Sequence, residues 1–138
     1  MNIQSAFAYI TNSIASLYEP REAANIAHLV MEYVTGLGKL DRIVYKDKTL
    51  ELTQQAKLEQ AVESLLQQQP VQYVTGTAWF YGMELMVNTQ VLIPRPETEE
   101  LVEWIVSDVR EKGDTGLKLL DIGTGSGCIP LALKKELP

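Results

Sequence analysis

One short stretch of the sequence carries residue types suited to holding a small polar ligand. It reads Asp121-Ile122-Gly123-Thr124-Gly125-Ser126-Gly127. Glycine lets the backbone turn sharply and approach a ligand with no side chain in the way. A predicted helix follows from Cys128, and the free N–H groups and positive dipole end of such a helix favour a polar or anionic group at its start.

The spacing of the glycines separates the classes of ligand. A dinucleotide fingerprint, Gly-x-Gly-x-x-Gly, needs glycine at position 128, which is Cys128 here, and the Gly-Lys-Ser/Thr of a P-loop is absent. The observed spacing resembles the S-adenosylmethionine loop of class I methyltransferases, with a nicotinamide dehydrogenase as a weaker alternative. The residues expected to bind S-adenosylmethionine in this loop are Asp121, Gly123, Thr124, Gly125, Ser126 and Gly127.

The elements around the loop predict the start of an α/β domain. Leu117–Asp121 has little polar character and is expected to form a buried strand, with helices over 97–109 before it and 128–137 after it. Helix, strand, glycine turn and helix open a doubly wound, Rossmann-like sheet. Because one strand is not a sheet, residues 94–138 are expected to be an incomplete domain.

A β-hairpin linker is predicted over residues 71–93. The stretch 72–75 is rich in β-forming residues, and 78–81 and 84–87 flank Gly82-Met83, a pair that suits a two-residue type II′ turn.

Residues 1–70 are predicted to form a small helical bundle. Apolar residues recur at helical spacing, first at Ile3, Phe7, Ile10, Ile14 and Leu17. Pro20 can begin a second helix and Gly36 can end it. A shorter helix is expected over 40–45. Thr53 is the expected N-cap of the next helix, which ends before Pro70.

The segments before the glycine loop resemble one family. They are Gln69–Gly76, Phe80-Tyr81-Gly82 and Ile93-Pro94-Arg95-Pro96-Glu97-Thr98-Glu99-Glu100-Leu101-Val102. The sequence resembles the N-terminal portion of release factor glutamine-N5 methyltransferases, the HemK/PrmC family. The resemblance covers the whole chain and is specific from about residue 70 to residue 127.

The resemblance implies an enzyme that methylates a glutamine side-chain amide in a peptide chain release factor, with residues 1–70 recognising the protein substrate. It implies that Arg95, Glu97 and Thr98 close over the methionine end of S-adenosylmethionine. It also places Leu92 and Pro94 near the substrate glutamine. The family's Asn-Pro-Pro-Tyr motif does not occur here, so no catalytic residue is expected within this chain, which alone should be inactive.

The charge and composition of the chain argue against several classes of function, namely nucleic-acid binding, membrane-spanning and metal-binding proteins. The 138 residues carry a net charge of −6 without a basic cluster, so direct nucleic-acid binding is not expected. No apolar run is long enough for a membrane span, no metal-ligand spacing is present, and the single cysteine, Cys128, fits a reducing cytoplasm. A DNA adenine or other amide/amine methyltransferase, or a truncated partner-binding protein without activity, stays open as an alternative.

Overall fold

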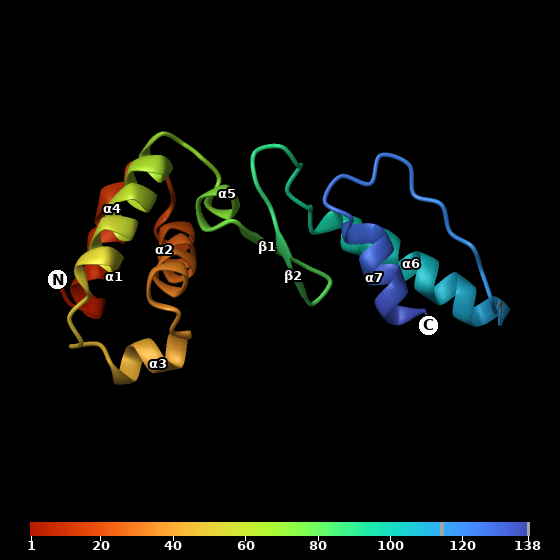
Figure 1. The fold of residues 1–138 in the computed structure, drawn as a ribbon, viewed down its shortest axis with the longest axis horizontal. Coiled ribbons are helices and arrows are strands. Elements are labelled where there is room, and N and C mark those ends of the chain that lie inside the picture. The colour runs from red at the N-terminus through yellow and green to blue at the C-terminus, as the bar shows by residue number, and fades with distance from the viewer. Residues whose placement is uncertain (114, 138) are drawn as a thin grey trace. The chain divides into compact units, whose positions relative to one another are not determined.

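The computed structural model describes residues 1–113 and 115–137, which are mostly helical with one two-stranded antiparallel hairpin (Figure 1). The chain divides into two compact units, residues 1–75 and residues 76–138. Each unit has its own buried apolar cluster. Among the described residues, no helix is both long enough and apolar enough to cross a membrane.

The first unit is an all-helical bundle, as the sequence predicts. Its helices are α1 (Ile3–Ile14), α2 (Pro20–Thr35), α3 (Lys39–Val44), α4 (Leu52–Leu66) and α5 (Val71–Thr75). The apolar faces of α1, α2 and α4 meet in the core, and the three helices lie alongside one another in Figure 1.

Helix α1 follows from local capping and from the apolar spacing. The side chain of Asn2 accepts a hydrogen bond from the N–H of Ser5 at 2.8 Å, and the hydroxyl of Ser5 accepts one from the N–H of Asn2 at 2.9 Å. This reciprocal pair satisfies two donors that the helix start leaves without partners. The helix ends at Ile14, so Leu17 is 40% exposed and does not extend the buried stripe.

Helix α2 begins and ends at the residues that the sequence predicts. Pro20 occupies its first turn, where a missing N–H costs nothing, and Gly36 ends it in the left-handed conformation with φ +68°. The N–H of Gly36 donates to the carbonyl of Glu32 at 2.7 Å.

We expect Gly36→Ala to lower the free energy of unfolding by about 1 kcal/mol, because a Cβ disfavours the left-handed region. Urea denaturation followed by circular dichroism measures the loss. Gly38→Ala is the matched control, since Gly38 has an ordinary φ of −64° and its added Cβ would meet only an ordinary contact. Equal destabilisation by both variants would contradict the conformational explanation.

Two local predictions in this unit are wrong. The N-cap of helix α4 is Glu51 and not the predicted Thr53, so the helix begins two residues earlier than expected. The side-chain oxygen of Gln54 accepts a hydrogen bond from the N–H of Glu51 at 3.0 Å, which stabilises this earlier start. The β-rich stretch 72–75 belongs to helix α5, which packs on α2 and α4 and buries Val71. Tertiary packing therefore overrides local β-propensity here. Because α5 packs with the bundle, the first unit extends to residue 75 rather than residue 70.

The second unit contains the predicted hairpin and two helices. Its elements are β1 (Thr77–Phe80), β2 (Met83–Met86), α6 (Glu97–Lys112) and α7 (Cys128–Glu136). The strands pair from Thr77 opposite Met86 to Phe80 opposite Met83. A second core forms from the buried side chains of Phe80, Leu85, Val102, Val106, Cys128, Ala132 and Leu133.

The hairpin turn differs from the predicted one by one residue. Tyr81 and Gly82, rather than Gly82 and Met83, are its central pair, with φ values of +49° and +67°. Positive φ at both central positions is the signature of a type I′ turn, not a type II′ turn. A left-handed tyrosine is uncommon, and contacts with α6 described below hold it in place.

Candidate cofactor-binding site

The glycine loop has a backbone that favours glycine at each of its three glycine positions. Gly123, Gly125 and Gly127 have φ values of +77°, +57° and +78°. A side chain at these positions would be strained, since L-residues rarely adopt the left-handed region. The spacing seen in the sequence therefore reflects three left-handed positions in one short, largely exposed loop.

The loop leads directly into the start of α7. Gly127 is the N-cap, and the first N–H bonded back along the helix is that of Leu131, which donates to the carbonyl of Gly127 at 3.1 Å. The N–H groups of Cys128 and Ile129 therefore stand at the open end of the helix, where a polar ligand is favoured. Pro130 fits at the third position, because no intrahelical bond is needed there.

Asp121 contributes an acceptor that the protein leaves unused. Its Oδ2 atom is buried and has no hydrogen-bond partner among the described residues. The hydroxyl of Thr124 donates to the backbone carbonyl of Asp121, at 3.4 Å, and not to the carboxylate. A buried carboxylate oxygen without a donor is costly, so this position fits a ligand that presents hydrogen-bond donors.

The strand predicted over Leu117–Asp121 is not formed in the described residues. The segment has no regular secondary structure and no strand partner, and it lies in the connection that arches between α6 and α7 (Figure 1). Leu120 and Ile122 are each 86% exposed. A strand exists only through pairing with a neighbour, and neither hairpin strand pairs with this segment.

A groove of about 590 Å³ runs beside this segment. Its walls are apolar side chains of α6 and α7, including Leu101, Ile105 and Leu133, and Asp121 lines one part of it. Apolar walls of this kind suit packing against a sheet, as expected for helices of a Rossmann-like domain.

The Pro-Arg-Pro-Glu-Thr segment forms the entry to α6. The N–H of Thr98 donates to the carbonyl of Arg95 at 3.0 Å, and Glu97 is the first helical residue. The side chain of Arg95 is exposed, Leu92 is 71% exposed and Pro94 is partly buried. In the described part of the chain, no hydrogen bond or ion pair joins these residues to the glycine loop.

The hairpin is joined to α6 by Tyr81, for which the sequence carries no local signal of this role. The N–H of Tyr81 donates to Oε1 of Glu99 at 2.8 Å, and its hydroxyl donates to the carboxylate of Glu103. The hydrogen bond to Glu103 raises the pKa of Tyr81 to about 12, because it stabilises the protonated phenol. These bonds fix the turn beside the first two turns of α6.

The comparisons with known proteins decide the family. A family model described as the PrmC N-terminal domain matches residues 5–76. The chain belongs to the PrmC family. The match ends one residue after the helical unit, so the PrmC N-terminal domain corresponds to the bundle of α1 to α5.

Curated PrmC relatives extend the similarity over the glycine loop. A release factor glutamine methyltransferase of Flavobacterium psychrophilum is 37% identical over 139 residues, covering 100% of this chain and 49% of that protein. One of Bacteroides thetaiotaomicron is 43% identical over 131 residues, covering 95% of this chain and 46% of the relative. The chain thus spans about half the length of these methyltransferases.

Proposed function

We propose that this chain is the N-terminal part of an enzyme that transfers a methyl group from S-adenosylmethionine to the side-chain amide of a glutamine in a peptide chain release factor. The names of its relatives support the reaction and the substrate. The observation that carries the proposal is the loop of three left-handed glycines between Asp121 and the open end of α7. This arrangement brings backbone donors and a carboxylate to one place.

The residues that would hold the cofactor are those of the loop. The backbone of Gly123, Thr124, Gly125, Ser126 and Gly127 would surround its polar part, and the unused Oδ2 of Asp121 would accept a hydrogen bond from it. When bound, S-adenosylmethionine supplies a sulfonium methyl group that a nucleophilic nitrogen can accept. The contribution of this chain is to bind and orient, and orientation alone can lower a barrier by several kcal/mol, about 7–11 in well-aligned cases.

The entry to α6 would complete this half of the site. Arg95, Glu97 and Thr98 would close over the methionine part, where a guanidinium and helix-terminal N–H groups would stabilise its carboxylate. Leu92 and Pro94 would lie near the glutamine. On this proposal residues 94–138 begin a Rossmann-like domain, the helical unit docks the release factor, and the reaction takes place in the cytoplasm.

A methylation assay on the full-length protein tests the proposal. Mass spectrometry of a release factor incubated with the protein and S-adenosylmethionine should show one added methyl group on a glutamine. The 138-residue chain alone should give no turnover, since it contains no Asn-Pro-Pro-Tyr motif. Methylation of a DNA oligonucleotide in place of the release factor, or turnover by the 138-residue chain, would overturn the corresponding part of the proposal.

A further inference from the structure

A second cavity lies within the helical unit. It has a volume of about 260 Å³, below the ~300–1,000 Å³ typical of small-molecule sites, and thus suits a single large side chain better than a whole cofactor. We call it the α3 pocket. Its lining residues come from α1, α2, α3 and the position just after α3: Ile3, Gln4, Phe7, His28, Met31, Lys39, Arg42, Ile43 and Lys46.

The charged side chains that line the α3 pocket are all cations. Arg42 is only 6% exposed, and its guanidinium donates to the carbonyl of Leu37, while Lys39 and Lys46 are exposed at the pocket. The acidic residues Asp41 and Asp47 alternate with them in sequence but do not line it. Within the described residues no carboxylate forms an ion pair with Arg42, and the carboxylate of Glu32 attracts its charge without direct contact. The residues that line the pocket therefore supply no negative charge of their own.

His28 helps to hold Arg42 in the wall of the pocket. Its ring packs on Phe7 with centroids 4.8 Å apart, and its Nδ1 lies 3.3 Å from Nη2 of Arg42. Burial lowers the pKa of His28, and the nearby Lys39 and Arg42 lower it further. The neutral ring can then accept the hydrogen bond from Arg42, but it supplies no negative charge.

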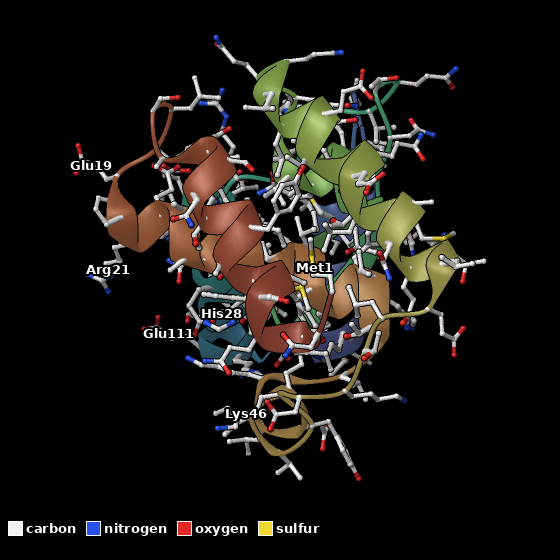
Figure 2. The ribbon with its side chains drawn as sticks, turned by 90° about the vertical axis from the view of Figure 1, so that its left-hand side faces the viewer. Met1, Glu19, Arg21, His28, Lys46 and Glu111 are labelled. Atoms are coloured by element: carbon white, nitrogen blue, oxygen red, sulfur yellow. The ribbon has the colours of Figure 1, made fainter. Side chains whose placement is uncertain are left out.

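Large apolar side chains of α3 are exposed to solvent. Leu40, Ile43 and Val44 are 78%, 62% and 74% exposed, and of these three only Ile43 lines the cavity. A six-residue helix with three such side chains in solvent is unusual for a surface that stays uncovered. The α3 pocket therefore combines an apolar cavity with three cations, and Figure 2 labels two of its lining residues, His28 and Lys46.

We propose that the α3 pocket binds an acidic segment of a partner protein, with a large apolar side chain in the cavity and neighbouring carboxylates against Lys39, Arg42 and Lys46. Charge complementarity favours this occupant, since carboxylates supply negative charge that no lining residue of the pocket provides. A nucleic acid is less suitable, because only three cations line the pocket in a chain of net charge −6.

The identification of this partner as the release factor rests on the proposed function, whereas the binding chemistry does not. Binding is therefore measured without S-adenosylmethionine and without methyl transfer. If the acidic peptide does not bind, the methylation assay is unaffected. If no methylation is found, the binding measurement remains valid.

The test uses the 138-residue chain and a fluorescein-labelled peptide of the pattern Glu-Leu-Glu-Phe-Glu, followed by fluorescence anisotropy. The acidic peptide should bind. A control peptide in which glutamine replaces every glutamate, the glutamine twin, should bind at least about tenfold more weakly. The double variant Lys39→Glu/Lys46→Glu should weaken binding to a similar extent. Both lysines are exposed, so these substitutions leave the packing of the bundle unchanged, which circular dichroism verifies.

Arg21→Glu is the matched control, because Arg21 is an exposed cation of the same unit that does not line the α3 pocket and lies well apart from Lys46 in Figure 2. It should leave the affinity within about twofold of the original, because solvent and salt screen an exposed charge that does not line the pocket. Absence of binding, equal binding of the glutamine twin, equal weakening by Arg21→Glu, or preferential binding of a single-stranded oligonucleotide would each overturn the proposal.

Discussion

A full-length protein carrying Gly125→Val is expected to lose S-adenosylmethionine binding, with an affinity at least about tenfold lower in isothermal titration calorimetry. Gly125 has φ +57°, where a non-glycine residue is strained by about 1–2 kcal/mol. Valine is a poor choice there because its branched side chain restricts the backbone further. On the proposed function this loop approaches the ligand closely, so the valine side chain would displace either the loop or the ligand.

Gly36→Val separates this local effect from a general loss of stability. Gly36 has a similar φ of +68° with open space around it, but lies in the helical unit. This variant should unfold more easily and still bind S-adenosylmethionine with unchanged affinity. Normal binding by the Gly125→Val variant would remove the glycine loop from the proposed site.

Much of the helical unit could be predicted because each of its main helices buries one regular stripe. Ile3, Ile10 and Ile14 are fully or almost fully buried, as their spacing predicts. Pro20 and Gly36 mark the ends of α2 through backbone constraints that act within one turn. Such signals are local, and the sequence shows them directly.

The errors arose where distant residues decide a local conformation. Val71–Thr75 has β-forming side chains, yet packing against α2 and α4 makes it helical. Either Tyr81-Gly82 or Gly82-Met83 could supply a two-residue turn. The bonds from Tyr81 to Glu99 and Glu103, 18 and 22 positions away, favour the first. No short sequence window contains both partners.

The candidate sites show the same division. The three left-handed glycines of the loop are a local property and follow from the spacing. The α3 pocket was not predicted, because a lone arginine in a short helix is ordinarily exposed. Only the fold brings Arg42 to His28, 14 positions earlier in the chain, and buries it.

The bundle itself should depend strongly on its central leucine. Leu65→Ala in α4 is expected to lower the free energy of unfolding by about 2–5 kcal/mol, because Leu65 is 0% exposed and its truncation leaves a cavity in the core. Small domains are stable by only about 5–15 kcal/mol, so this one change could remove a large part of the total. Urea denaturation followed by far-ultraviolet circular dichroism measures the loss of helix.

Leu52→Ala is the matched control, with the same chemical change in the same helix at a side chain that is 85% exposed. It should change the stability by no more than about 0.5 kcal/mol. Both tryptophans, Trp79 and Trp104, lie in residues 76–138, so their fluorescence follows the second unit separately. If Leu65→Ala were no more destabilising than Leu52→Ala in the circular dichroism transition, the core formed by α1, α2 and α4 would not be the source of the stability of the helical unit.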